Sequence, residues 1–304
     1  MRPLRFGLVG TGHWARIAHA PALASADGIE FTAIWGRDQR AAGHIAGAYG
    51  IRPYADFDAF LADVDAVAFA VPPDVQSALA IRAAATGKHL LLEKPLALTA
   101  ADADAVTKAV EDAGVAALVF FTSQFQADVR SWLADVAKAG GWVGGSALWL
   151  GSALSQDSPF NTPWRRDKGG LWDLAPHLIA LLWASLGAVT SVTADAGHDD
   201  VAHLVLHHSG GASSVITVTL AAPEEAEFLE VWLWGSAGRS AAPRESGEAV
   251  VALRTALTEL AACARSGQLD HRCDVRFGRD VTLVIADAYA QITARRAAAG
   301  PGEH

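Results

Sequence analysis

The chain has 304 residues, of which 51% are hydrophobic, 19% charged and 8% aromatic. This composition is typical of an ordered globular protein and excludes a disordered or fibrous one, and the length favours two domains over one. Twenty-four Lys and Arg stand against 33 Asp and Glu, a formal charge of −9. That balance argues against nucleic acid or an anionic membrane as a partner.

The cellular compartment is indicated by cysteine content and by the apolar segments. Cys263 and Cys273 are too few for a disulfide scaffold or a zinc site, so we expect reduced thiols and no metal. The N-terminus enters a strand pattern without an apolar signal segment. The most apolar stretch, residues 171–189, contains Asp173 and His177 and does not fit a membrane span. We therefore expect a cytoplasmic protein.

Short β-rich runs alternate with Ala-rich helical runs up to about residue 121. The strand-like runs are, in order, LRFGLVG, EFTAIWG, AVAFAV, HLLLEKP and VAALVFF. Strands separated by helices of this length indicate right-handed crossovers and a parallel sheet buried on both faces. Residues 1–121 are therefore predicted to form a doubly wound α/β domain.

The regular alternation of strand-like and helical segments ends at about residue 122. The expected elements are a helix near 128–139, a strand-like run GSALWLG, a loop over 151–170, a helix over about 171–186, strand-like runs at 191–196, 201–207, 212–220 and 228–234, and helices at about 250–266 and 279–297. Successive strands with short turns indicate an antiparallel sheet. Residues 122–304 are predicted to form a second α/β domain.

A glycine-rich turn, Gly10-Thr11-Gly12-His13-Trp14-Ala15, follows the first strand and opens a helix. This is the setting of the dinucleotide fingerprint: Gly10 allows the tight turn, Gly12 lets the backbone approach a pyrophosphate, and Ala15 replaces the third glycine. Free N–H groups at the helix start attract phosphates. The alternative is a tight turn that binds nothing.

The choice between the two nicotinamide cofactors depends on the loop after the second strand, Ile34-Trp35-Gly36-Arg37-Asp38-Gln39-Arg40. Position 36 lacks the carboxylate that accepts hydrogen bonds from a ribose 2′-hydroxyl, whereas Arg37 and Arg40 can bind a 2′-phosphate. The loop favours NADP. NAD remains open, with Asp38 as the ribose ligand.

Glu93-Lys94-Pro95 follows the apolar run HLLL, at the carboxyl end of a predicted parallel strand. Open α/β sheets bind ligands at that edge. A lysine in apolar surroundings can have its pKa lowered enough to act as an acid or to polarise a substrate hydroxyl. The alternative is a Glu–Lys surface pair that ends the strand.

Asp173 and His177 are four residues apart in a predicted helix, so both are expected on one helix face. An imidazole beside a carboxylate can relay a proton. The alternative is a histidine satisfied within the core.

Three weaker signals lie in the second half of the chain. Trp164-Arg165 stands in the loop before that helix, and either covers a cofactor or is an exposed loop. Trp232 and Trp234 share one face of a strand, which indicates either a core against helices or an oligomer interface. The remaining histidines of the predicted strands, His203, His207 and His208, are expected to be surface residues.

Taken together, these motifs resemble the glucose-fructose oxidoreductase, inositol dehydrogenase and rhizopine-catabolism (Gfo/Idh/MocA) family of NAD(P)-dependent oxidoreductases. The likeness covers essentially the full length. It rests on the order of Gly10–Ala15, Asp65-Ala66-Val67 leading into Val71-Pro72-Pro73, the run Gly87–Ala97 around Glu93-Lys94-Pro95, and Gly169-Gly170 ahead of Asp173 and His177.

The resemblance implies a Rossmann domain followed by a domain with an open, mainly antiparallel sheet that commonly forms dimer or tetramer contacts. It implies hydride transfer between the nicotinamide and the carbonyl or secondary alcohol of a sugar, polyol or related cyclic substrate. Lys94, Asp173 and His177 then correspond to the catalytic set, and Trp164-Arg165 to the pair that covers the cofactor. The residues implied at the cofactor also include Gly10, Thr11, Gly12, His13, Trp14, Arg37, Arg40, Val71, Pro72, Gln76, Glu93 and Lys94.

The sequence also departs from the family pattern. Ala175 and Ala180 stand where a glycine and a second aspartate are frequent, and Gln76 replaces a histidine. Fewer polar groups would then line the substrate pocket, so a dehydrogenase of a less polar diol is an alternative. A second alternative is a dinucleotide-binding regulatory protein without catalysis.

Overall fold

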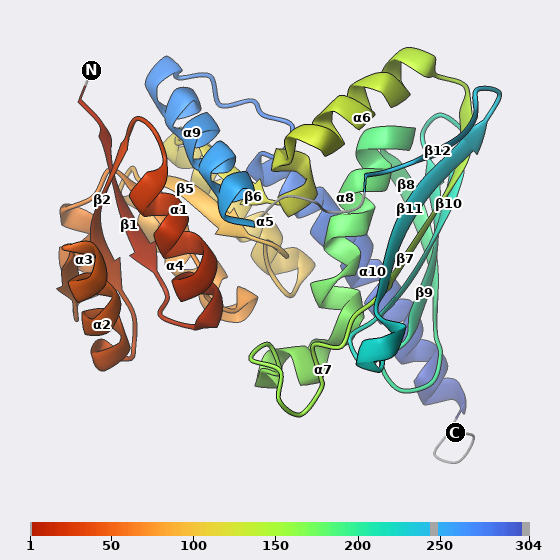
Figure 1. Ribbon diagram of the computed structural model, residues 1–304, viewed down its shortest axis with the longest axis horizontal. Helices are drawn as coiled ribbons and strands as arrows, with labels where there is room; N and C mark the ends of the chain where they lie inside the picture. Colours follow the sequence, from red (N-terminus) through yellow and green to blue (C-terminus); the bar gives the residue numbers. More distant parts are fainter. Residues whose placement is uncertain (1, 244–248, 300–304) are drawn as a thin grey trace. The chain divides into compact units, whose positions relative to one another are not determined.

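The structure is a computed structural model that describes residues 2–243 and 249–299 (Figure 1). The described chain forms two units, residues 2–126 with 249–280 and residues 127–243 with 281–299. The helix α9 (Ala249–Ser266), which lies in the second domain of the sequence prediction, packs in the first unit.

A six-stranded parallel sheet forms the centre of the first unit. Its strands are β1 (Leu4–Val9), β2 (Ile29–Trp35), β3 (Arg52–Tyr54), β4 (Ala66–Phe69), β5 (His89–Glu93) and β6 (Ala117–Phe120). They lie in the order β3-β2-β1-β4-β5-β6, which is the order of a Rossmann fold. The predicted doubly wound domain is confirmed. The edge strand β3 was not predicted, because three residues around Pro53 carry no periodic pattern.

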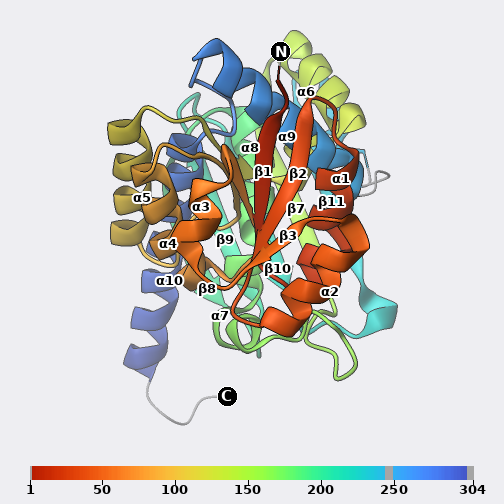
Figure 2. The same ribbon diagram turned by 90° about the vertical axis from the view of Figure 1, so that its left-hand side faces the viewer.

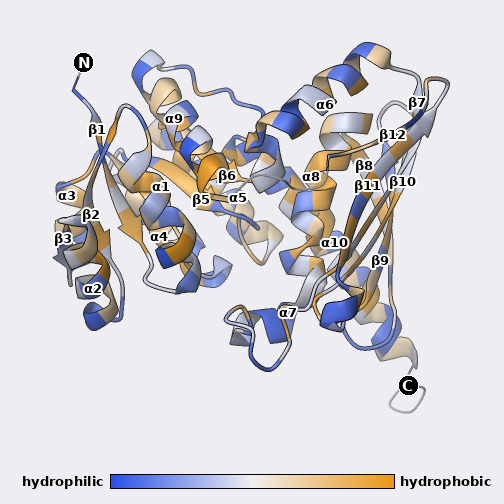
Figure 3. Ribbon diagram, in the orientation of Figure 1, coloured by the Kyte–Doolittle hydropathy of each residue, from blue (hydrophilic) through white to orange (hydrophobic). Residues whose placement is uncertain are grey.

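Helices cover both faces of this sheet (Figure 2). They are α1 (Ala20–Ser25), α2 (Gln39–Tyr49), α3 (Phe57–Ala62), α4 (Pro73–Ala85), α5 (Ala100–Ala113) and α9. Helix α4 packs beside α5, and α1 packs beside α9. Because the sheet is covered on both sides, consecutive residues of β1 are buried, β6 is wholly apolar and the centre of β5 is apolar (Figure 3).

Local sequence explains where several helices begin. The side chains of Asp38, Asp56 and Thr99 accept hydrogen bonds from backbone N–H groups in the first turns of α2, α3 and α5. Such caps satisfy donors that have no partner inside the helix.

A second six-stranded sheet forms the centre of the other unit. Its strands are β7 (Trp142–Leu150), β8 (Val189–Ala196), β9 (Ala202–His208), β10 (Ser213–Thr219), β11 (Phe228–Gly235) and β12 (Gly238–Ala241). In the order β12-β11-β7-β10-β9-β8, only the β7–β10 pair is parallel among these strands. The mainly antiparallel sheet is confirmed, and β12 is an addition to the predicted strands.

The helices of this unit are α6 (Ala127–Ala139), α7 (Pro163–Asp173), α8 (Ala175–Leu186) and most of α10 (Val275–Ala299). The apolar helix α8 packs on β7 and β10 (Figure 3). Burial alternates strictly along β9, so this sheet has one covered face and one open face.

Two further predictions concern thiols and membranes. Cys263 and Cys273 are both free, as predicted. Across residues 2–243 and 249–299, no helix is long and apolar enough to cross a bilayer.

Candidate functional site

The glycine turn lies where β1 ends, against the turn that follows β4. Gly10 has φ +124°, and a Cβ added there would lie 2.3 Å from the carbonyl oxygen of Ala70. A Cβ added at Gly12 meets nothing within 4 Å, so the backbone there stays open to a ligand. Val71 and Pro72 are partly exposed beside this turn. The arrangement fits the close backbone approach that a pyrophosphate requires.

The helix that follows this turn contains a π-turn, Ala15–His19, closed by a hydrogen bond from the Ala20 N–H to the Ala15 carbonyl. Thr11, His13 and Trp14 ahead of it are partly exposed. Ala15 is fully buried, as close packing of the helix on the strand requires. π-turns are rare and occur frequently at functional sites.

The π-turn brings His19 to Glu93 at the end of β5. Trp14 Nε1 donates to Glu93 Oε1 over 2.7 Å, and His19 Nε2 lies 2.8 Å from the same oxygen. His19 is 1% exposed and Glu93 9%. Glu93 therefore connects the glycine turn to the segment that carries Lys94. Sequence analysis missed His19, although it follows the fingerprint by only four residues.

Gln76 is fully buried and holds the same segment from α4. Its Oε1 accepts a hydrogen bond from the Glu93 N–H, and its Nε2 donates to the Glu93 carbonyl, both over 2.8 Å. Nε2 also lies 3.2 Å from the carbonyl oxygen of Leu96. Within this segment the Lys94–Pro95 peptide is cis, and Lys94 is partly exposed. Gln76 thus shapes the backbone on both sides of Lys94.

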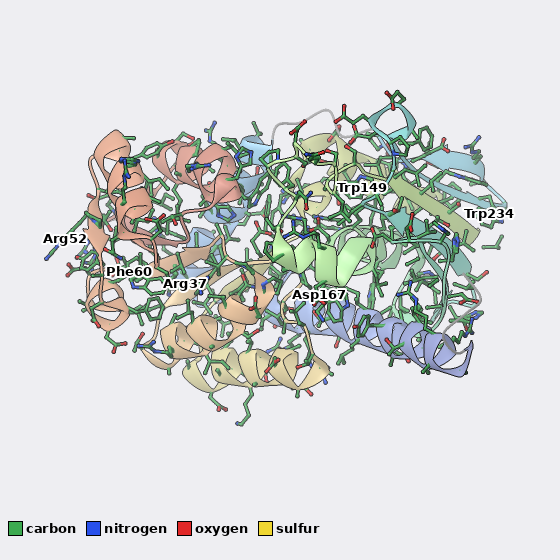
Figure 4. The ribbon with its side chains drawn as sticks, turned by 90° about the horizontal axis from the view of Figure 1, so that it is seen from below. Arg37, Arg52, Phe60, Trp149, Asp167 and Trp234 are labelled. Carbon is green, nitrogen blue, oxygen red and sulfur yellow. The ribbon has the colours of Figure 1, made fainter. Side chains whose placement is uncertain are left out.

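Arg37 is exposed in the loop between β2 and α2 (Figure 4), and Arg40 is exposed in the first turn of α2, not in the loop that the sequence predicted. The Asp38 carboxylate accepts a hydrogen bond from the Ala41 N–H over 2.9 Å, so this side chain is engaged as the cap of α2. A Cβ at Gly36 would lie 2.5 Å from the Thr11 methyl group. The position normally occupied by a ribose-binding acid therefore has no room for a side chain without movement of Thr11.

In the second unit, Arg165 and Asp173 form a salt bridge inside α7. Arg165 Nε donates to Asp173 Oδ2 over 2.7 Å, and Asp173 is 5% exposed. The guanidinium also stacks on the rings of Trp164 and Phe160, 4.8 and 5.4 Å from their centroids. Arg165 is therefore tied to one of the predicted catalytic residues.

Asp173 and His177 do not lie in one continuous helix, contrary to the sequence expectation. Helix α7 ends at Asp173, and α8 begins after Leu174. Pro176 has no N–H to donate, and the His177 N–H bonds to the Leu174 carbonyl three residues back. The two side chains are nevertheless close in sequence and flank this break.

His177 is the only partly exposed residue in the described segment Gly169–Leu182. Its ring centroid lies 5.6 Å from that of Trp149 on β7; Figure 4 labels Trp149. Partial exposure of one polar ring within a buried apolar helix argues against a histidine that serves only the core.

Asp200, which sequence analysis did not single out, reaches α7 from the β8–β9 loop. Its carboxylate accepts hydrogen bonds from the N–H groups of Gly170 and Leu220. Burial raises the pKa of Asp200 above its usual range, and the nearby Asp173 charge adds to this effect. The only sequence signal was the Gly169-Gly170 pair, which marks a close approach.

The strand histidines divide into two groups. His203 and His207 are exposed, as predicted, but His208 is 3% exposed, and that prediction is wrong. Its Nδ1 lies 2.8 Å from the Gly187 carbonyl oxygen and its Nε2 2.9 Å from the Ser214 hydroxyl. Alternation along β9 directs His208 to the covered face.

Trp232 and Trp234, the latter labelled in Figure 4, lie on the open face of the second sheet, with ring centroids 5.0 Å apart. Trp232 is partly exposed and Trp234 is 37% exposed. The Arg239 guanidinium stacks 4.4 Å from the centroid of Trp232. In the described chain this face is not covered by the helices of its own unit, so the core interpretation of the pair does not hold.

Comparison with protein families gives two matches. Residues 4–121 match the model described as the oxidoreductase family with an NAD-binding Rossmann fold (GFO/IDH/MocA). Residues 144–240 match the C-terminal domain of the same family.

The chain is also similar to individual proteins over part or most of its length. The chain is 34% identical over 125 residues to a 4-carboxy-2-hydroxymuconate-6-semialdehyde dehydrogenase of Sphingobium, covering 40% of this chain and 39% of that protein. It is 28% identical over 228 residues to an inositol 2-dehydrogenase of Rhizobium meliloti, covering 70% and 68%. The fold is similar to that of an oxidoreductase domain protein from Kribbella flavida, with a TM-score of 0.86, 23% identity and coverage of 97% and 98%.

Proposed function

Because the chain belongs to the GFO/IDH/MocA family of oxidoreductases, we propose that it transfers a hydride between a nicotinamide cofactor and the carbonyl or secondary alcohol of a sugar, polyol or related cyclic substrate. The inositol 2-dehydrogenase among its relatives supports this substrate class. The observation that carries the proposal is the connection between the glycine turn and Lys94 through Glu93, which couples cofactor binding to a candidate acid.

For the cofactor, we propose that the turn Gly10–Trp14 binds the pyrophosphate and that Val71 and Pro72 line the same edge of the sheet. Glu93 and Lys94 contact the nicotinamide end of the cofactor in this proposal. Gln76 supports that end indirectly, because its amide is occupied by the backbone around Glu93. A bound nicotinamide supplies or accepts the hydride.

For the chemistry, we propose that Lys94, Asp173 and His177 act on the reacting oxygen. His177 exchanges a proton with that oxygen, and Lys94 polarises it or helps to protonate it. Asp173 orients the pair, and Arg165 holds the Asp173 carboxylate in a fixed direction through a charge-assisted hydrogen bond. With Trp164 stacked on Arg165, this pair shields the site from water.

We propose NADP as the preferred cofactor. Arg37, in the loop expected to contact the adenosine ribose, and Arg40, in the first turn of α2, are both exposed, and Asp38 is engaged as a helix cap. Charge-assisted bonds from Arg37 would hold a 2′-phosphate.

A less polar substrate is the second candidate, and one observation favours it. Trp149 lies against His177, so an apolar ring borders the candidate proton donor. The semialdehyde dehydrogenase among the relatives acts, by its name, on a compound that is not a sugar.

We propose that the open sheet face with Trp232 and Trp234 mediates a homodimer or homotetramer. Light scattering of the wild-type chain and of Trp234→Ser tests this assembly.

The deciding experiment has two parts. First, the purified protein is titrated with NADPH and with NADH, and energy transfer from its tryptophans to the nicotinamide is followed. Second, a panel of polyols, sugars and cyclic diols is tested for reduction of NADP+ and NAD+. We expect tighter binding of NADPH and turnover of a cyclic polyol or sugar. Binding of neither cofactor contradicts the oxidoreductase assignment, and binding without turnover favours a regulatory protein.

A further inference from the structure

The β8–β9 loop directs one carboxylate at the start of a short helical turn. Oδ1 and Oδ2 of Asp200 lie 3.0 and 3.1 Å from the amide nitrogen of Gly170, and Oδ2 lies 2.6 Å from that of Leu220. Both amides donate to the same side chain. Asp200 therefore joins the middle of α7 to the end of β10.

Two glycines make room for this contact. Gly169 has φ +66° and ψ −168°, a conformation that interrupts α7 and that other residues rarely adopt. A Cβ on Gly169 would lie 1.8 Å from Asp200 Oδ1. A Cβ on Gly170 would lie 3.0 Å from the Thr219 Cα atom. The two glycines thus stand at the positions where the Asp200 carboxylate and the backbone of Thr219 come closest to the helix.

The interruption leaves a second helical piece that begins at Gly170. Its first N–H groups need acceptors from outside, as at any helix start. Asp200 supplies one acceptor from 30 residues further along the chain. The Leu174 N–H then bonds to the Gly170 carbonyl over 2.8 Å, and this turn carries Asp173.

Asp173 is thereby fixed from two sides. The turn that Asp200 caps sets its backbone, and Arg165, from the piece of α7 before the interruption, binds its carboxylate. His177 follows within one turn of α8. A change in the direction of the Gly170 turn would move both side chains of the proposed site.

We propose that Asp200 is a positioning residue, which holds the turn Gly170–Asp173 so that Asp173 and His177 point at the substrate. The consequence for catalysis rests on the proposed function, whereas the capping contact does not. Asp200 touches neither the substrate nor the cofactor in this proposal and acts only through the turn.

The electrostatic setting agrees with a functional role. The groups that face the Asp200 carboxylate are the two amides, the Thr219 hydroxyl and the like charge of Asp173. Burial and that like charge disfavour its ionised form. A carboxylate held against such a cost is typical of a site where geometry matters more than stability.

The test compares Asp200→Ala and Asp200→Asn with the wild-type chain. The matched control is Asp199→Asn, since the neighbouring Asp199 side chain is 71% exposed. Two measurements need no substrate: hydrogen exchange of the amides of residues 170–174, and the NMR titration of the His177 imidazole. Where the wild-type chain turns over, kcat and the cofactor KM are measured as well.

We expect Asp200→Ala to raise exchange at Gly170 about 10-fold, the range of a lost helix cap, and to displace the His177 titration. Asp200→Asn retains an acceptor for the Gly170 N–H, so its exchange stays within about 3-fold of wild type and its His177 titration stays close to that of the wild type. In Asp200→Ala kcat falls and the cofactor KM does not change, whereas Asp200→Asn keeps most of the wild-type kcat. Asp199→Asn matches wild type throughout.

Unchanged exchange at Gly170 in Asp200→Ala overturns the cap, and an unchanged His177 titration in Asp200→Ala overturns the positioning role. If the alanine variant does not fold, Asp200→Ser, whose shorter side chain cannot span the two amides, takes its place in both measurements. A wild-type chain that shows both Asp200 effects but turns over nothing in the panel contradicts the proposed function and leaves the positioning role supported.

Discussion

His19 Nε2 lies 2.8 Å from Glu93 Oε1, and both side chains are buried at the carboxyl edge of the first sheet. Trp14 donates to the same oxygen, and Glu93 Oε2 accepts a longer bond from the Lys94 N–H over 3.3 Å. One carboxylate thus collects donors from the glycine turn and from the segment of the proposed catalytic lysine.

Glu93→Ala is expected to lower the free energy of unfolding by about 1–3 kcal/mol, because it leaves the buried His19 imidazole and the partly exposed Trp14 indole without their acceptor. Glu93→Gln keeps an acceptor oxygen and should lose less. Urea unfolding followed by circular dichroism measures both, with the exposed Glu30→Ala as control. Equal stability of Glu93→Ala and wild type would show that the contacts of Trp14 and His19 with Glu93 do not stabilise the fold.

Lys94→Ala is expected to lower kcat about 100-fold or more, which is the usual contribution of a general acid, while cofactor binding is largely retained. The matched control is Lys88→Ala, which changes a lysine just before the other end of β5. Steady-state kinetics with the best substrate of the panel and tryptophan-to-nicotinamide energy transfer provide the two readouts. Near wild-type turnover in Lys94→Ala would refute the assigned chemistry.

Arg37→Ala is expected to weaken NADPH binding about 10-fold or more and NADH binding little, because a charge-assisted bond to the 2′-phosphate is lost. Arg82→Ala, in which an exposed arginine of α4 is removed, should bind both cofactors as the wild type does. Equal weakening of both cofactors by Arg37→Ala would exclude Arg37 as the phosphate ligand.

Arg165→Ala is expected to destabilise the protein by about 3 kcal/mol, because it removes the guanidinium from a buried carboxylate. The same change should lower kcat through Asp173. Arg165→Lys restores the charge without the planar fork and should recover only part of both losses. The exposed neighbour Arg166→Ala is the control, and thermal unfolding with parallel kinetics makes the comparison.

Acidification is expected to destabilise the fold through His208. Burial lowers its pKa in the folded state, so the unfolded chain binds a proton more readily, and the free energy of unfolding falls as pH drops through the unfolded value near 6.5. The loss continues down to the lowered folded pKa. His89, whose pKa burial also lowers, contributes with the same sign.

Urea unfolding between pH 5 and 8 checks this dependence. His208→Asn should flatten part of the slope, because it removes the titrating ring, whereas His44→Asn, which changes an exposed histidine of α2, should leave the slope unchanged. An identical slope in His208→Asn and wild type would assign the pH dependence to other groups.

The local sequence pattern was sufficient to predict the first sheet and the position of the cofactor turn. Alternating strands and helices of regular length predict the first sheet, and the position of Gly10 and Gly12 between strand and helix predicts the cofactor turn. Glu93-Lys94-Pro95 was identifiable because strand direction places its carboxyl end at the binding edge. These features depend on neighbours within a few residues.

Other features depend on residues that are distant in sequence. Strands β3 and β12 are three and four residues long and exist because a neighbouring strand pairs with them. His208 is buried because alternation along β9 directs it to the covered face of the sheet, where the Gly187 carbonyl and the Ser214 hydroxyl meet its ring, although the sequence around it is polar.

The same division holds in the site. The Gly169-Gly170 pair indicates that another part of the chain comes close to the helix. The group that does so, Asp200, is 30 residues away and could not be identified from spacing. The contacts of Gln76 and His19 with Glu93 span 17 and 74 residues. Periodicity and turn residues depend on short segments, so they can be identified from the sequence. A buried hydrogen bond needs a partner that only the folded chain brings within about 3 Å.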